Sequence, residues 1–195
     1  MADSRRTRVN GTKATLLAAA REIFTSAGYA EANVVDIVEH AGSSVGSLYH
    51  HFGGKSDLFI ALYDDYQTRQ RHRSAKAFRL ALAAGETDAM RLFIAGARAY
   101  LEGCWEERTL ARLFLSGGGP PGFELLTRTS FRHWLTTNTE LLSDQARPLS
   151  DTLVLVLTTI ATEAGREVAV KPSRAAARRF VTEIVELMGR LYPTD

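Results

Sequence analysis

The sequence predicts an all-α protein, and three observations support this. Apolar residues recur three and four positions apart over long stretches, which is the spacing of one helical face. These stretches begin at residues that cap helices and end at glycine or at proline-rich segments. No stretch alternates apolar and polar residues as a half-buried β-strand does. We therefore expect about nine helices: an amino-terminal unit of three short helices, a long connecting helix and a helical carboxy-terminal domain.

Length and composition indicate an ordinary globular protein. The 195 residues are 45% hydrophobic and 24% charged, with a formal net charge of +2, which suits one or two small domains. The chain starts with a polar, basic segment, and no stretch approaches the roughly 18 uninterrupted apolar residues of a membrane span. Cys104 is the only cysteine. We therefore expect a cytoplasmic protein without a membrane partner.

The first helix is predicted from apolar residues on one face, and it ends at Gly28. The residues of this face are Leu16, Leu17, Ala20, Ile23, Phe24 and Ala27. Asn33 can cap a second helix, and Asp36 three residues later completes a pair like a capping box. Gly42 ends that helix, because glycine adopts a left-handed backbone at little cost and the chain can turn sharply there.

A third helix follows at once, with Ser44 as its cap. Leu48 and Phe52 lie four residues apart and are expected to face inward. The outward face is small and hydrogen-bonding, with Val45, Gly46, Ser47, Tyr49 and His50. A helix in the DNA major groove needs short side chains where its backbone approaches base edges, with donors, acceptors and apolar groups around them. Residues 33–52 therefore predict a helix-turn-helix motif that binds double-stranded DNA.

These outward residues suggest individual contacts with DNA. Val45 can touch a thymine methyl group, and Ser47 and His50 can hydrogen-bond to bases or phosphate. Lys55 begins the fourth helix, where its charge and the free backbone N–H groups can hold a phosphate. The candidate DNA-binding residues of this unit are Asn33, Ser43, Ser44, Val45, Gly46, Ser47, Tyr49, His50 and Lys55. A helical hairpin with no nucleic-acid role would have the same caps and periodicity.

Residues 1–11 form a predicted flexible basic arm before a DNA-binding domain at residues 12–60. Acidic residues balance the basic ones over these segments, but the positive charges gather in the first thirteen residues. Arg5, Arg6 and Arg8 can follow the DNA backbone or enter the minor groove, and each neutralised phosphate adds to the salt dependence of binding. The alternative is a disordered terminus without a role.

At these residues the sequence resembles the tetracycline-repressor (TetR) family. The shared signature comprises Gly28-Tyr29, Ala41-Gly42, the run Leu48-Tyr49-His50-His51-Phe52, and Lys55, within residues 10–60. The resemblance implies that Tyr49 and Lys55 contact phosphates and that residues 43–50 read the groove. It also implies a homodimer and a small molecule bound between the later helices.

The sequence departs from the family pattern at three places. Asn33 replaces the usual threonine or serine, Ser43 a common apolar residue, and Gly53-Gly54 a frequent proline-serine pair. Capping chemistry survives each change. The glycine pair is expected to loosen the link into the fourth helix, since glycine loses more backbone freedom on ordering.

Residues 61–195 are predicted to form a helical ligand-binding and dimerisation domain. The fourth helix runs from residue 55 to about residue 83, and further helices are expected at about 88–103, 105–115, 123–142, 150–168 and 173–191. The glycine- and proline-rich loop at residues 116–122 lacks the ending of a phosphate-binding loop. Five basic residues of the fourth helix are expected to form a solvated face rather than a second nucleic-acid patch; they are Arg69, Arg71, Arg73, Lys76 and Arg79.

The last two helices have wide apolar faces, which one domain core need not absorb. A twofold pairing of these faces would produce a four-helix interface, and a dimer could place two reading helices one DNA turn apart on a palindromic operator. The candidate interface residues are Leu153, Leu157, Ile160, Phe180, Ile184, Leu187 and Met188. The alternative is an ordinary monomer core.

The middle helices contain aromatic residues beside small ones, which can line an apolar pocket for an effector. The candidate ligand-binding residues are Arg98, Tyr100, Cys104, Trp105, Phe114, Phe131, Trp134 and Asn138. The alternative is that the aromatic side chains simply fill the core.

The predicted function is a ligand-responsive repressor. Effector binding is expected to shift the fourth helix, so that the two reading helices no longer match successive grooves. An activator of the same fold and an adaptor that does not bind DNA are alternatives. The histidines lack zinc-protease spacing and a lone cysteine cannot form a thiolate metal site, so we expect no enzyme activity, no metal and no cofactor.

Overall fold

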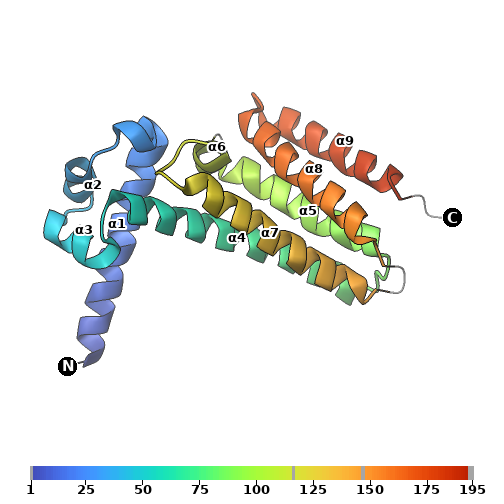
Figure 1. Cartoon of the computed structure of the whole chain (residues 1–195), viewed down its shortest axis with the longest axis horizontal. Helices are drawn as coiled ribbons and strands as arrows, with labels where there is room; N and C mark the ends of the chain where they lie inside the picture. The colour runs from blue at the N-terminus through green and yellow to red at the C-terminus, as the bar shows by residue number, and fades with distance from the viewer. Residues whose placement is uncertain (1, 116, 146–147, 193–195) are drawn as a thin grey trace. The chain divides into compact units, whose positions relative to one another are not determined.

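The computed structural model describes residues 2–115, 117–145 and 148–192, with side chains from residue 11 onward. Within these residues the chain forms nine α-helices and no β-strand, which confirms the all-α prediction (Figure 1). The helices are α1 (Ala2–Glu31), α2 (Val34–His40), α3 (Val45–Phe52), α4 (Lys55–Ala83), α5 (Ala89–Glu106), α6 (Arg108–Leu115), α7 (Phe123–Ser143), α8 (Asp151–Val170) and α9 (Arg174–Arg190). From α4 onward, the bounds lie within three residues of those predicted.

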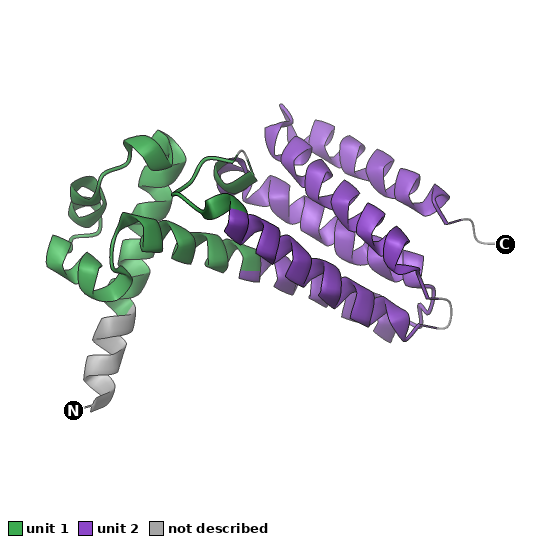
Figure 2. Cartoon of the chain, viewed as in Figure 1, with its two compact units in different colours: residues 1–67, 113–124 green, residues 68–112, 125–195 purple. Residues whose placement is uncertain are grey.

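The chain divides into two compact units, coloured separately in Figure 2. The first unit comprises residues 1–67 and 113–124, and the second comprises residues 68–112 and 125–195. Helices α4, α6 and α7 therefore each contribute residues to both units.

In the first unit, the conformation of Gly28 explains the glycine-tyrosine pair of the sequence. Gly28 has φ 79° and ψ 170°, so α1 is kinked there and continues for three more residues instead of ending as predicted. Beyond the kink, the Tyr29 ring packs against Phe24 and Phe59, with centroids 6.0 and 5.1 Å away. The Tyr29 hydroxyl lies 2.8 Å from that of Ser56. The kink thus places an aromatic side chain of α1 against the start of α4.

The caps predicted for α2 and α3 are confirmed. The Asn33 side-chain oxygen accepts a hydrogen bond of 2.8 Å from the Asp36 N–H, and the Ser44 hydroxyl accepts one of 3.2 Å from the Ser47 N–H. Gly42 has φ 59°, the left-handed conformation expected of it. The Asp36 carboxylate accepts from the Asn33 side-chain amide rather than from its backbone N–H, so the pair is not a full capping box.

An aromatic cluster forms much of the first unit's core. Phe59 and Tyr63 of α4 meet Phe114 of α6 and Phe123 of α7 edge to face, with ring centroids 5.0 to 5.3 Å apart. All four side chains are buried. Such edge-to-face pairs add to the free energy of burial, and they explain why residues 113–124 belong to this unit.

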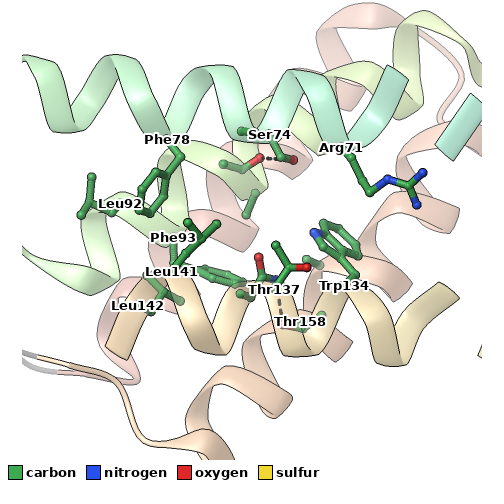
Figure 3. Close-up of a pocket in the computed structure, with 15 residues that line it drawn as sticks. Arg71, Ser74, Phe78, Leu92, Phe93, Trp134, Thr137, Leu141, Leu142 and Thr158 are labelled. Atoms are coloured by element: carbon green, nitrogen blue, oxygen red, sulfur yellow. Dashed lines mark hydrogen bonds between the residues drawn. The ribbon is translucent and has the colours of Figure 1, made fainter. Parts of the chain in front are cut away.

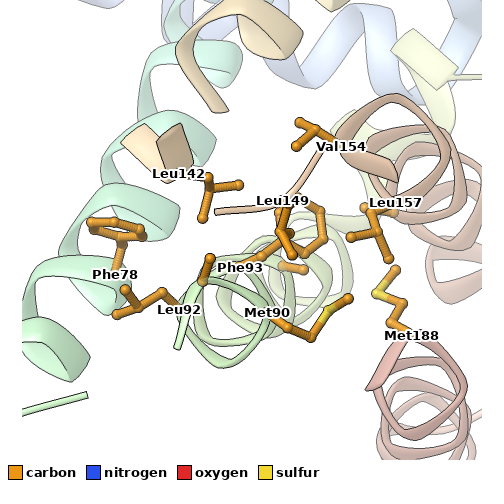
Figure 4. Packing of buried hydrophobic residues seen from close by; sticks show 12 residues of the cluster. Phe78, Met90, Leu92, Phe93, Leu142, Leu149, Val154, Leu157 and Met188 are labelled. Atoms are coloured by element: carbon orange, nitrogen blue, oxygen red, sulfur yellow. The ribbon is translucent and has the colours of Figure 1, made fainter. Parts of the chain in front are cut away.

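The second unit is built around α5, which packs against α8 and α9. Figure 4 shows Phe93 of α5, Leu157 of α8 and Met188 of α9 within one cluster of buried apolar side chains. A close approach between α5 and α8 requires Gly165, because a Cβ atom there would lie 2.8 Å from the Tyr100 hydroxyl.

A polar cluster joins α4 to the end of α5 in the second unit. The Glu107 carboxylate accepts from Arg69 Nε at 2.8 Å and from Arg73 at 3.2 Å, and Gln70 donates to it at 3.4 Å. Glu107 and Gln70 are buried. Two of the five basic residues predicted for a solvated face of α4 are therefore engaged in this half-buried cluster.

Candidate nucleic-acid interface and effector cavity

Helix α3 presents a small, exposed face that is compatible with a DNA groove. Val45, Gly46, Tyr49 and His50 are exposed, and Tyr49 exposes 54% of its surface although it is a large aromatic residue. On the opposite face, Leu48 is fully buried. Gly46, the one residue of α3 without a side chain, therefore lies among side chains that offer hydrogen-bond donors, acceptors and methyl groups.

Two of the predicted DNA contacts also hold the motif together. The side chains of Asn33 and Ser44 accept the backbone hydrogen bonds that cap α2 and α3. Ser47 donates its backbone N–H to the Ser44 cap, and Ser43 is half-buried in the turn before it. These residues fix the direction in which α3 leaves the turn.

Lys55 lies at the first turn of α4, but its ammonium group points to the end of α1. Lys55 Nζ donates to the carbonyl oxygens of Ala32 at 2.6 Å and Ala30 at 3.1 Å, and it lies 4.5 Å from the centre of the Tyr29 ring. A cation is favoured at a helix carboxy terminus, where backbone carbonyls lack partners. Two of the three donors of the ammonium are thus used within the fold.

The predicted basic arm is not described in the same detail. Arg5, Arg6 and Arg8 lie among residues whose side chains are outside the described part of the chain. Their contact with DNA stays a prediction.

A cavity of about 110 Å³ lies in the second unit among α4, α5, α7 and α8 (Figure 3). Most of its wall is apolar, with Phe78, Leu92, Phe93 and Leu142 among the side chains that Figure 3 labels. The full lining is Arg71, Ser74, Ala75, Phe78, Leu92, Phe93, Gly96, Ala97, Trp134, Thr137, Asn138, Leu141, Leu142, Thr158 and Ala161.

The sequence predicted only two of these lining residues as ligand contacts, Trp134 and Asn138. Tyr100 packs on Trp134 with ring centroids 4.7 Å apart but does not line the cavity. Cys104 is fully buried beside Gly165.

The remaining predicted ligand contacts lie elsewhere. Phe114 belongs to the aromatic cluster of the first unit, Trp105 stacks under Arg108 at 4.5 Å, and Arg98 and Phe131 are not in the cavity wall.

The contribution of α4 and α8 to the cavity was not predicted from the sequence. Ser74 and Phe78 lie four residues apart on α4 and both line it, and Thr158 lines it from α8. The spacing of Ser74 and Phe78 on one helical face was the available signal, but apolar periodicity alone cannot separate a cavity wall from a filled core.

The predicted interface residues of α8 and α9 have different surroundings in the single chain. Leu157 and Met188 are fully buried in its core, so they have no surface to offer to a second copy. Leu153, Ile160, Phe180 and Ile184 are half-buried, and Leu187 is 49% exposed. Other exposed apolar side chains of this part of the chain are Leu155 and Val156 of α8 and Leu191, which follows α9.

No helix in the described residues combines the length and apolar character needed to cross a membrane.

Comparisons with known proteins identify relatives of this chain. Residues 16–62 match the family described as bacterial regulatory proteins, tetR family. The HTH-type transcriptional repressor AcnR of Corynebacterium glutamicum is 45% identical over 47 residues, which are 24% of this chain and 25% of AcnR. The chain therefore spans about a quarter of the length of this curated relative.

Solved structures extend the similarity to nearly the whole chain. A TetR-family transcriptional regulator from Pectobacterium atrosepticum superposes with a TM-score of 0.65 and 26% sequence identity, over 95% of this chain and 94% of that one. A complex of SmeT with triclosan superposes with a TM-score of 0.74 and 16% identity, over 94% and 92%. The second similarity concerns the fold alone.

Proposed function

We propose that the chain is a regulator of the TetR family, because residues 16–62 match that family and the whole chain resembles a TetR-family regulator in its fold. We propose further that it is a repressor that binds a palindromic DNA operator as a homodimer. In this proposal a small molecule enters the cavity of the second unit and releases the protein from DNA. Such a regulator would act in the cytoplasm, where it meets its operator. The chain is not an enzyme, in keeping with the regulators that it resembles.

The observation that carries the proposal is the exposed face of α3. Large apolar and aromatic side chains are usually buried, yet Val45 is 41% and Tyr49 54% exposed beside Gly46. The N-terminal end of α3 is capped by the short side chain of Ser44, which leaves room there for a groove. This combination supports base contact by Val45 and Ser47 and phosphate contact by Tyr49.

The helices that the two units share support the roles proposed for these units. Helix α4 carries Lys55 beside the DNA-binding motif and Phe78 in the cavity wall. A ligand that binds more tightly when α4 has one placement than when it has another therefore favours one arrangement of the DNA-binding unit. The ligand can do so only through this difference in affinity. A preference of about 10²-fold for one arrangement corresponds to a coupling free energy of roughly 2.7 kcal/mol.

Selection from a random pool of DNA duplexes tests operator binding directly. DNA selected by the purified full chain should contain a palindrome, and its affinity should fall steeply with salt. Tyr49→Ala should weaken binding to the selected DNA by about tenfold or more, because a phosphate contact is lost. Leu80→Ala removes another exposed apolar side chain, on α4, and should leave the affinity unchanged.

Two results would contradict the proposal. One is a folded dimer that enriches no sequence from the pool and binds all duplexes with equal weakness at low salt. The other is an equal loss of affinity in Tyr49→Ala and Leu80→Ala, because this would show that α3 has no special role.

A further inference from the structure

The cavity of the second unit has one charged residue in an otherwise uncharged wall. That residue is Arg71 of α4, and no carboxylate is among the side chains that line the cavity. Figure 3 shows Arg71 and Trp134 toward one end, with Phe78, Leu92 and Leu142 toward the other. The cavity is therefore apolar at one end, and Arg71 lies at the other end, with its guanidinium exposed and directed outward.

The guanidinium of Arg71 remains available for a ligand. Among the described residues it donates to the Thr68 hydroxyl at 3.1 Å and forms no ion pair. By contrast, Arg69 and Arg73 on the same helix are engaged by Glu107. A guanidinium has five N–H donors in a planar fork that matches a carboxylate.

Other polar groups of the wall are largely satisfied within the protein. Ser74 donates to the Gly96 carbonyl at 3.0 Å, Thr137 donates to the His133 carbonyl at 3.0 Å, and Asn138 donates to the Thr158 hydroxyl at 3.3 Å. These bonds leave the middle of the cavity suited to an apolar group.

The volume limits the size of the apolar group. A cavity of about 150 Å³ in another protein accommodates benzene, and the volume here is about 110 Å³. One aromatic ring with small adjustments of the wall is therefore the scale of group that fits. Phe78, Phe93 and Trp134 provide aromatic faces and edges for it.

We propose that this cavity binds a small monocarboxylate with a single aromatic ring, with the ring among Phe78, Phe93 and Trp134 and the carboxylate at Arg71. This inference rests on the proposed function, because it names the chemical class of the effector. It assigns Arg71 as the residue that selects an anion over a neutral molecule of the same shape.

A matched pair of probes tests the assignment. The acid 3-phenylpropanoate and its amide, 3-phenylpropanamide, have nearly the same shape but differ in charge. In calorimetric titrations of the full chain, the acid should bind at least about fivefold more tightly than the amide, because only the acid forms a charge-assisted hydrogen bond with Arg71. Arg71→Gln should reduce the affinity for the acid to that for the amide and leave the affinity for the amide unchanged.

Arg79→Gln is the matched control, because Arg79 is also an exposed arginine of α4 but does not line the cavity. It should preserve the preference for the acid. Thermal unfolding of both variants establishes that they are folded. When the same measurements are made on a chain that carries Trp105→Phe, Trp134 is the only tryptophan, so its fluorescence reports binding at the cavity.

Three outcomes would overturn the inference: equal affinity for acid and amide, a preference that persists in Arg71→Gln, and no binding of either probe at millimolar concentration. DNA binding is measured separately by gel shift. A protein that binds its selected DNA but neither probe would refute the ligand class alone, whereas a protein that prefers the acid but binds no DNA would refute the proposed function alone.

Discussion

At the scale of single residues, two glycines near α3 have opposite roles. Gly53 follows α3 with φ 72°, and a Cβ atom there would lie 2.5 Å from a carboxylate oxygen of Asp57. Gly46 lies within α3, and a Cβ atom there would meet nothing within 4 Å. The fold therefore requires glycine at position 53 but not at position 46, where the absence of a side chain suits a close approach to DNA.

Substitution by alanine separates these roles. Gly46→Ala should raise the free energy of unfolding by about 0.5–1 kcal/mol, because alanine favours the helix, yet weaken binding to the selected DNA by roughly tenfold or more, because a methyl group would separate α3 from the bases. Chemical denaturation and gel-shift titration measure the two effects. Unchanged DNA affinity in a stabilised Gly46→Ala would show that α3 does not approach the bases closely.

Gly53→Ala is the companion variant. It should lower the free energy of unfolding by about 1–3 kcal/mol, because alanine is strained at positive φ. Its DNA affinity should be close to that of the unchanged chain at temperatures where both are folded.

At the scale of helices, α4 is held to the end of α5 by a single buried carboxylate. Glu107 accepts from Arg69, Gln70 and Arg73, whereas its neighbour Glu106 is exposed and meets Arg73 alone at 3.3 Å. Gly103 permits this approach, because a Cβ atom there would lie only 2.9 Å from Arg73 Cδ. This contact between α4 and the end of α5 therefore involves one acidic residue that the sequence did not distinguish from its neighbours.

The two glutamates allow a direct comparison. Glu107→Gln should lower the free energy of unfolding by about 1–3 kcal/mol, because two half-buried guanidinium groups lose their common carboxylate. Glu106→Gln should change it by no more than about 0.5 kcal/mol, since an exposed ion pair contributes little. Equal effects of the two changes in urea denaturation would show that burial does not strengthen the Glu107 pairs.

At the scale of the whole molecule, the exposed apolar residues of α8 and α9 are available for a second copy. Leu155 and Val156 of α8 are 43% and 42% exposed, and Leu187 and Leu191 are 49% and 43% exposed. The neighbouring Leu157 and Met188 support these helices from inside the core. A dimer built on this face would use side chains adjacent to several of those that the sequence suggested.

Leu187→Glu tests this surface. A twofold interface contains each substitution twice, so two carboxylates would be buried without partners. We expect the dissociation constant of the dimer to rise by roughly 10²–10³-fold, with a parallel loss of operator affinity, as measured by light scattering and gel shift. Leu80→Glu, which places the same charge at an exposed site of α4, should remain dimeric. If the Leu187→Glu protein remains dimeric, the dimer interface lies elsewhere.

The sequence by itself determined the local structure of this protein. Caps such as Asn33 and Ser44 act within three or four residues, and left-handed turns such as Gly42 depend only on the absence of a side chain. Apolar periodicity is likewise local, and it was enough to predict all the helices from α4 onward. The DNA-binding face of α3 could be proposed for the same reason, since a short helix has only one face to bury.

Only the tertiary structure decided which side chains from distant helices share a cavity, a cluster or a surface. Phe114 and Trp134 are both aromatic residues on helices, yet one fills the core of the first unit and the other lines the cavity of the second. Lys55 has a charge that suits phosphate, yet its ammonium group caps the end of α1. Apolar periodicity predicts that a side chain faces inward. Which side chains it then contacts depends on how the helices pack, and packing is a long-range property of the folded chain.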